Sequence, residues 1–256
     1  MTQGFHYSEK FYSSVDLRAS NTAKVVFKTL KSYIHVDSIV DAGCGSGAWV
    51  RTAIEGGVTR AYGIDLLSSL TLIAGNINFE KILTNGMLIL KERDFVKDSQ
   101  SKLPSADLAI CLEVVEHLPP NIATSLVAKL AEASKFVVFS AAQPGQGGTY
   151  HINERPIEYW VEEFAKHNFE PFDPFREILN KSKDVPRFYA LNMLLFVSKE
   201  ALESDNRIVD KTVFDRVKVN NLRQLEKRTP LEKFRYTLMK KLPVRVVTAL
   251  SMRLKY

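Results

Sequence analysis

The segment SIVDAGCGSG, residues 38–47, decides how this chain folds. Its apolar start is typical of a buried strand, which leads into Asp41 and then into three alternate glycines, Gly43, Gly45 and Gly47. Glycine tolerates positive φ and lets a ligand approach the main chain closely. A strand that ends in such a loop and opens a helix predicts a site for a nucleotide-like ligand. The spacing is neither the dinucleotide pattern G-x-G-x-x-G nor that of a phosphate-binding P-loop.

The pattern D-x-G-x-G-x-G resembles the first motif of the class I methyltransferases that use S-adenosylmethionine. In that family the loop passes beside the methionine part of the cofactor. The resemblance therefore implies that Asp41, Gly43, Gly45 and Gly47 contact S-adenosylmethionine. For a glycine loop taken alone, the alternative is a tight strand-to-helix turn that binds nothing.

A second short apolar run, residues 61–65, ends in Asp65 about twenty residues after the loop. An ionised carboxylate only accepts hydrogen bonds and can take two vicinal ribose hydroxyls, so we expect Asp65, with Leu66 beside it, to bind the ribose. The alternative is that Asp65 caps the N-terminus of a helix.

A third run, residues 87–90, leads toward Asp94 and Phe95. In the resembling family an acidic residue at this place bonds the adenine amino group and its neighbour covers the ring. The resemblance assigns these roles to Asp94 and Phe95, and an ordinary loop acid is the alternative.

Further apolar runs at residues 106–112 and 136–139 continue the alternation of strands and helical segments, which indicates βαβ units. Residues 169–175 and 189–198 are expected to form the antiparallel hairpin typical of the family. The predicted fold class is α/β: a Rossmann-like class I methyltransferase with a seven-stranded, mostly parallel sheet, an antiparallel last strand and helices on both faces. A helical extension follows at the C-terminal end.

The resemblance narrows to one bacterial methyltransferase group, whose members often lie among genes for surface glycans or decorated small molecules. It covers roughly residues 11–198 and implies that Tyr12 and Arg18 close over the cofactor and that Glu113 lines it. The segments that carry it, besides the glycine loop, are FY at 11–12, EVVEHLP at 113–119, FSAAQPGQGG at 139–148, HINE at 151–154 and YW at 159–160.

The candidate catalytic residues are Glu116, His117 and a distant His151. A helix that began at Glu113 would place Glu113, Glu116 and His117 on one face. Three interpretations stay open. In the first, His117 acts as a general base for a hydroxyl acceptor. In the second, Glu113, Glu116, His117 and His151 hold a divalent metal that binds the acceptor oxygen. In the third, the segment at 113–118 has only a structural role. The metal arrangement resembles that of the small-RNA ribose 2′-O-methyltransferases.

Residues 143–148, QPGQGG, follow the fifth strand and are expected to form a mobile loop over the site. Tyr159 and Trp160 begin an amphipathic helix. Core packing is the first interpretation of their rings, and sugar stacking is the second.

Charge is distributed unevenly along the 256 residues. Residues 1–204 carry a net charge of −3, whereas residues 205–256 carry +9. We therefore divide the chain into a methyltransferase domain with an N-terminal cover, 1–204, and a basic amphipathic helical tail, 205–256. We expect the tail to pack on the domain or on a second subunit, as in a homodimer, or to contact a membrane surface through residues 230–256, and nucleic-acid binding by the tail is the remaining alternative. The acidic domain disfavours nucleic acid.

The expected function is O-methylation, from S-adenosylmethionine, of a sugar hydroxyl in a glycan, a lipid-linked saccharide or a glycosylated metabolite. The alternatives are methylation of an RNA ribose or a small-molecule amine, and a non-catalytic scaffold that docks at membranes. No leader of basic and then apolar residues follows Met1, and no run approaches the roughly 18 apolar residues that span a bilayer. A bacterial cytoplasm is the expected location, with the inner membrane face as the alternative. Two cysteines suggest no disulfide framework.

Overall fold

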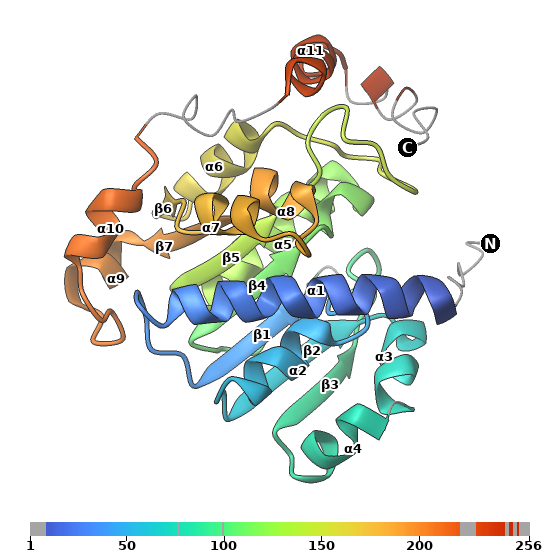
Figure 1. Cartoon of the computed structure of the whole chain (residues 1–256), viewed down its shortest axis with the longest axis vertical. Helices are drawn as coiled ribbons and strands as arrows, with labels where there is room; N and C mark the ends of the chain where they lie inside the picture. The colour runs from blue at the N-terminus through green and yellow to red at the C-terminus, as the bar shows by residue number, and fades with distance from the viewer. Residues whose placement is uncertain are drawn as a thin grey trace.

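The computed structural model describes residues 9–75, 77–98, 100–220, 229–243, 246–247 and 250, with residues 9–15 and positions 72, 77, 78, 81 and 232 described by their backbone alone. A seven-stranded sheet lies at its centre (Figure 1). The strands are β1 (Ser38–Ala42), β2 (Arg60–Asp65), β3 (Leu88–Glu92), β4 (Leu108–Leu112), β5 (Phe136–Ser140), β6 (Phe169–Phe172) and β7 (Leu194–Ser198).

Helices connect and cover the strands, and a single 3₁₀ turn, η1 (Val115–His117), follows β4. The helices are α1 (Glu9–Leu30), α2 (Ala48–Glu55), α3 (Leu67–Ala74), α4 (Ile77–Thr84), α5 (Pro120–Ala133), α6 (Ile157–Ala165), α7 (Arg176–Lys181), α8 (Arg187–Asn192), α9 (Lys199–Ser204), α10 (Thr212–Val217) and α11 (Pro230–Met239). Among the described residues, none of these helices has both the length and the apolarity to cross a membrane.

The strands lie in the order β3-β2-β1-β4-β5-β7-β6. Strands β3, β2, β1, β4 and β5 are parallel to one another, whereas β7 runs antiparallel to both β5 and β6. Because the chain moves outward from β1 to β3 and then returns to β4, the strand order switches between β1 and β4, where open α/β sheets bind ligands. The predicted seven-stranded sheet with an antiparallel last strand is confirmed.

One predicted strand is shorter than expected. Residues 189–198 were expected to form a strand, but β7 begins at Leu194, and the residues before it belong to helix α8. Periodicity alone cannot separate a buried strand from a buried helix in an apolar run of this length. Pro186 precedes the first turn of α8, where its fixed φ suits the start of a helix.

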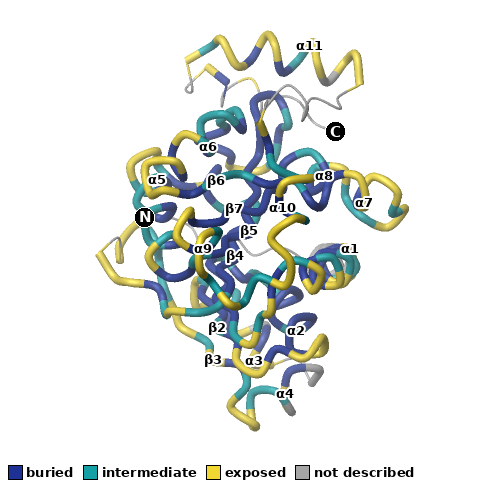
Figure 2. Tube along the Cα trace, turned by 90° about the vertical axis from the view of Figure 1, so that its left-hand side faces the viewer, coloured by how far each residue is buried: buried dark blue, intermediate teal, exposed yellow. Residues whose placement is uncertain are grey.

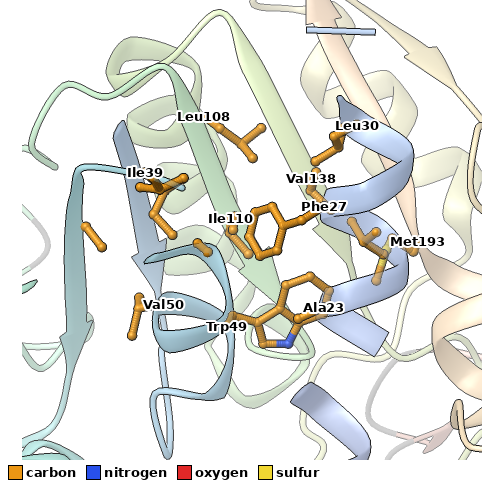
Figure 3. Packing of buried hydrophobic residues seen from close by; sticks show 14 of the residues in the cluster. Ala23, Phe27, Leu30, Ile39, Trp49, Val50, Leu108, Ile110, Val138 and Met193 are labelled. Carbon is orange, nitrogen blue, oxygen red and sulfur yellow. The ribbon is translucent and has the colours of Figure 1, made fainter. Parts of the chain in front are cut away.

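Successive residues of a strand point to opposite faces, so the sheet has a core on each side. On one face, Ile39 and Ile110 pack beneath α1 and α2 with Phe27 and Trp49 (Figure 3). On the other face, a second core gathers under α5 and α6. Figure 2 shows the buried trace running through the strands between these two layers. Trp49 is part of the first core, 5.9 Å by ring centroids from Phe27, and is itself buried.

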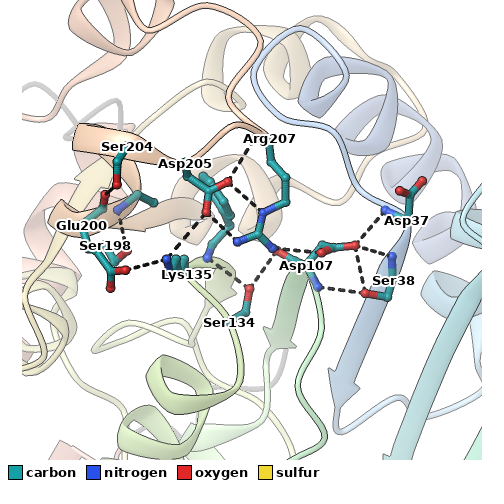
Figure 4. Close-up of polar contacts among 12 residues, drawn as sticks. Asp37, Ser38, Asp107, Ser134, Lys135, Ser198, Glu200, Ser204, Asp205 and Arg207 are labelled. Atoms are coloured by element: carbon teal, nitrogen blue, oxygen red, sulfur yellow. Dashed lines mark hydrogen bonds and ion pairs between the residues drawn. The ribbon is translucent and has the colours of Figure 1, made fainter.

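A polar network holds the chain after α9 against the end of the sheet where β1 and β4 begin (Figure 4). Arg207 forms ion pairs with Asp205 (2.6 Å) and with Asp107 (2.9 Å). Asp107 also accepts hydrogen bonds from the backbone N–H and hydroxyl of Ser38, at the start of β1. Residues after the predicted domain boundary at 204/205 therefore contact the sheet, and Phe214 is buried in the first core.

Asp205→Asn is expected to lower the free energy of unfolding at pH 7. The Arg207 guanidinium lowers the pKa of Asp205 from 3.8 to about 2. A lowered folded-state pKa means that the stabilisation is present above the unfolded-state pKa near 3.8 and is lost as the pH falls toward 2. We expect the substitution to lower the free energy of unfolding by about 1–2 kcal/mol at pH 7, after allowance for solvent screening of the partly exposed guanidinium. Below pH 4 this loss should become smaller. Urea unfolding at pH 7 and pH 3 measures this.

The matched control is Asp210→Asn, since the side chain of Asp210 is exposed and its hydrogen bonds are with Thr212. It should leave the urea midpoint nearly unchanged. Equal destabilisation by both substitutions, or an Asp205→Asn effect that is the same at both pH values, would contradict the role given to the Asp205–Arg207 pair.

Candidate active site

The glycine loop after β1 is built as the motif requires, and its three glycines have different roles. All three have positive φ: 90° at Gly43, 53° at Gly45 and 79° at Gly47. A Cβ added at Gly43 would lie 2.3 Å from a methyl of Val114, and one added at Gly47 would lie 2.8 Å from the ring of Phe79. A Cβ at Gly45 would meet nothing within 4 Å. Gly45 therefore presents open main chain to a ligand, whereas the other two glycines allow close packing.

Asp65 is held at the end of β2 by two main-chain donors. The N–H of Gly45 donates to Oδ2 (2.8 Å) and the N–H of Leu66 donates to Oδ1 (2.7 Å). Helix α3 starts after Leu66 and has no side-chain cap, so Asp65 does not cap it, and that alternative is wrong. Each carboxylate oxygen keeps a lone pair that can accept another hydrogen bond, as vicinal hydroxyls would require.

Asp41, the penultimate residue of β1, is a buried carboxyl group, 3% exposed. Burial, with a smaller repulsion from Asp65, raises the pKa of Asp41 to about 8. Its Oδ2 is buried and has no hydrogen-bond partner among the residues that the structure describes. Buried polar atoms are nearly always paired, so this oxygen marks a place where a donor or cation from a ligand fits.

The other residues predicted to bind the cofactor are less clearly arranged for binding. Asp94 accepts hydrogen bonds from the N–H groups of Val96 and Lys97, so in the structure it closes its own loop. Phe95 is partly buried against the second core. Arg18 is exposed on α1, and the side chain of Tyr12 lies outside the described residues.

A residue that the sequence did not reveal connects α1 to the glycine loop. Asp16 accepts a hydrogen bond from the hydroxyl of Ser46 (2.8 Å) and forms an ion pair with Arg51 (3.1 Å). The contact joins residues thirty positions apart, and no local pattern in the sequence signals it.

The carboxyl end of β4 brings three of the four predicted chemical groups together. One ligand atom each from Glu116, His117 and His151 lies within 4.8 Å of the others. Glu116 and His151 are buried, and His117 is exposed. The rings of the two histidines meet edge to face, with centroids 4.9 Å apart.

Glu113 is not part of this cluster, and its predicted position on one helix face with Glu116 and His117 is wrong. The 3₁₀ turn begins at Val115, and Glu113 precedes it with a left-handed φ of 55°. Its two carboxylate oxygens instead accept hydrogen bonds from the amides of Gln146 (3.0 Å) and Asn192 (3.2 Å). Pro119 and Pro120 leave room for a single turn after β4, which is too short for the face that was predicted.

Each of the two histidine rings, His117 and His151, has a hydrogen-bond acceptor next to its Nδ1. Glu154 Oε1 lies 3.0 Å from Nδ1 of His151, and the carbonyl oxygen of Tyr150 lies 3.3 Å from Nδ1 of His117. With acceptors at these positions, we assign the proton to Nδ1 of each ring. Nε2 is then the nitrogen with a lone pair, available to accept a proton or to bind a cation.

The loop at residues 143–148, expected to be mobile, is mostly buried and hydrogen-bonded. Glu154 accepts from the N–H groups of Gly145 and Gly147, both at 3.0 Å. A Cβ added at Gly148 would lie 2.2 Å from Nε2 of His151, so the loop fits closely against that ring. One carboxylate, that of Glu154, thus joins the loop to the histidine.

The protonation of the cluster follows from its surroundings. His117 is exposed overall, but neighbouring side chains displace part of the water around its ring, and this desolvation, together with repulsion from His151, lowers the pKa of His117 to about 4. Burial first, and then the charge of Glu113, raises the pKa of Glu116 well above its usual value. At neutral pH His117 is therefore an uncharged imidazole that can accept a proton or bind a cation.

No family model and no curated protein matches the sequence. Among solved structures, the methyltransferase domain of bacterial CtHen1 has a TM-score of 0.52 and 17% identity, with 72% of this chain and 98% of that chain covered. Magnesium protoporphyrin IX methyltransferase from Synechocystis PCC 6803, with bound SAH, has a TM-score of 0.51 and 18% identity, with 77% and 90% covered.

Human N-acetylserotonin methyltransferase in complex with SAM has a TM-score of 0.50 and 16% identity, with 74% of this chain covered. The match spans about half, 55%, of the human chain, but nearly all of the CtHen1 domain. These similarities agree with the strand order, the antiparallel β7 and the glycine loop after β1. The chain has the class I S-adenosylmethionine-dependent methyltransferase fold.

Proposed function

We propose that this protein is an S-adenosylmethionine-dependent methyltransferase. The fold supports the proposal, and three features of the loop fit the cofactor: open main chain at Gly45, the fixed carboxylate of Asp65 and the unpaired buried oxygen of Asp41. S-adenosylmethionine supplies an electrophilic methyl group when bound. The residues of the loop would bind the ribose and the amino-acid part of the cofactor and hold its methyl toward the end of β4.

The acceptor that we propose is a hydroxyl, because a neutral hydroxyl needs its proton removed before it attacks. The single observation that carries this is the Glu116–His117–His151 cluster, which lies after β4, next in the sheet to the strand of the glycine loop. We further propose a sugar hydroxyl, in a glycan, a lipid-linked saccharide or a glycosylated metabolite. Tyr150 supports this, since its carbonyl oxygen contacts the ring of His117 and its side chain is exposed, and an exposed tyrosine ring suits stacking against a sugar.

The same cluster fits a divalent metal with three protein ligands. Two imidazoles and one carboxylate suit a divalent transition metal and leave positions open for the acceptor oxygen. Glu116 supports this, because its Oε2 is buried and finds no hydrogen-bond partner in the described part of the chain. Donors on one ion lie at most about 4.2 Å apart, so the present spacing of up to 4.8 Å requires a small side-chain rotation. Glu113, held by Gln146 and Asn192, is not among the proposed ligands.

Calorimetric titration of the full chain with S-adenosylmethionine tests the first part of the proposal. We expect saturable binding, and no heat at millimolar cofactor would contradict it. The acceptor is tested by mass spectrometry of surface glycans from a strain that lacks the gene, where one methyl group should be missing. Radiolabelled methyl transfer to a short RNA or to amines, in place of saccharides, would instead favour the alternative acceptors.

A further inference from the structure

Helix α11 is attached to the domain by one face, directly over the loop at residues 143–148. Tyr236 and Met239 are buried, and the hydroxyl of Tyr236 donates to Glu158 of α6 (2.8 Å). A Cβ added at Gly145 would lie 3.4 Å from side-chain atoms of both Arg235 and Met239. The helix therefore has a fixed inner face, which lies on the loop that Glu154 connects to His151.

Much of α11 is exposed (Figure 2), and three of its exposed side chains are large and apolar. Leu231 is 60% exposed, Phe234 67% and Leu238 53%. Their spacing of i, i+3 and i+7 places them in one stripe along the helix. Phe234 is the most exposed large apolar side chain among the described residues. A contiguous apolar stripe, unlike scattered exposed residues, marks an interaction surface.

The charges around this stripe identify its partner. Residues 230–241 contain four basic side chains, those of Lys233, Arg235, Lys240 and Lys241, and one acidic residue, Glu232. An apolar stripe on a helix with this excess of basic residues suits the interface of an anionic membrane. Two copies of this basic face would repel each other across a symmetric contact. Nucleic acid is a poor partner for this stripe, because three exposed apolar side chains gain nothing from contact with a phosphate backbone.

We propose that α11 docks the protein on an anionic lipid surface through Leu231, Phe234 and Leu238. The inner face of the helix keeps its contacts with the domain while the outer stripe enters the headgroup region. This inference does not depend on methyl transfer. Where the proposed function holds, docking sets the loop and the His117–His151 cluster close to the bilayer, and the acceptor is a hydroxyl on a lipid-linked molecule.

Flotation of the purified full chain with vesicles tests the proposal. We expect binding to vesicles of phosphatidylcholine and phosphatidylglycerol, weak binding to phosphatidylcholine alone, and release by high salt. Phe234→Glu should reduce the partition coefficient at least about tenfold. The matched control is Ile178→Glu on α7, which adds the same charge at another exposed apolar residue and should bind like the unmodified chain.

A second pair of variants tests the charge. Lys233→Gln with Lys241→Gln should weaken binding to anionic vesicles more than Lys24→Gln with Lys28→Gln, two exposed lysines of α1. Lys240 is left unchanged, because its Nζ lies 5.0 Å from the ring centroid of Tyr236 on the inner face. No flotation with anionic vesicles, or equal loss in either matched pair, would overturn the proposal. So would a dimer in light scattering that Phe234→Glu converts to a monomer, because a second copy would then cover the stripe.

Folding and cofactor binding are checked separately. Phe234→Glu should keep the far-UV circular dichroism and melting temperature of the unmodified chain, because the side chain of Phe234 is 67% exposed. S-adenosylmethionine titration without vesicles reports the proposed function alone. Loss of flotation with intact cofactor binding therefore concerns α11, whereas absent cofactor binding with intact flotation concerns only the methyltransferase proposal.

Discussion

Asp65→Ala is expected to weaken S-adenosylmethionine binding by about a hundredfold or more. The substitution removes the acceptor proposed for two ribose hydroxyls, and hydrogen bonds to a charged group contribute about 1.5–3 kcal/mol each. It also removes the partner of the Gly45 N–H, which fixes the open part of the glycine loop. Both effects act on the bound state, so the loss should appear in the dissociation constant measured by calorimetry.

The control for this substitution is Asp37→Ala, at the opposite end of β1, where the side chain is exposed. Asp37→Ala should bind the cofactor as the unmodified chain does. Asp65→Asn should fall between, because it keeps the shape of the side chain but presents an amide where hydroxyls and N–H groups need an acceptor. If Asp65→Ala binds S-adenosylmethionine with unchanged affinity, the ribose site is not at the end of β2.

His151→Ala is expected to reduce the methyl-transfer rate by about a thousandfold and to leave cofactor affinity within a few fold. Removal of a general base or a metal ligand costs on the order of 10²–10⁴ in rate. His151 meets His117 and Glu154 and has no contact with the glycine loop among the described interactions. Single-turnover methyl transfer, with cofactor affinity measured in parallel, separates the two effects.

The control is His167→Ala, because His167 is exposed and lies outside the cluster. Metal analysis then decides how the cluster acts. With a metal, the unmodified chain and His167→Ala bind one divalent ion per chain, and His151→Ala does not. Full activity after chelation, combined with loss of activity in His151→Ala, would contradict the metal and leave His117 and His151 as proton acceptors.

The sheet and the cofactor loop could be predicted because their signals are local. Each parallel strand is a short apolar run, and Asp41, Asp65 and the three glycines follow directly in the sequence. The carboxyl ends of parallel strands lie at one edge of the sheet, so the sequence also indicated that these residues lie close together.

Other features depend on contacts between distant residues, which no local pattern records. Glu113 takes a left-handed conformation and is bonded by Asn192, 79 positions away. Its exclusion from the predicted cluster follows from that contact and from the short turn before Pro119. The helix at α8 likewise reflects packing, because Tyr189 is buried in an apolar run that suits either a strand or a helix.

The burial of Phe214 limits how the chain can be shortened. Its ring meets Phe172 at 5.0 Å and Tyr33 at 5.5 Å, and Ile208 forms a β-bridge with Ile34. Cutting after residue 204 would expose this apolar surface to water and yield an aggregation-prone fragment. A shortened chain that keeps this packing should extend to residue 220, so that only the region carrying α11 is removed.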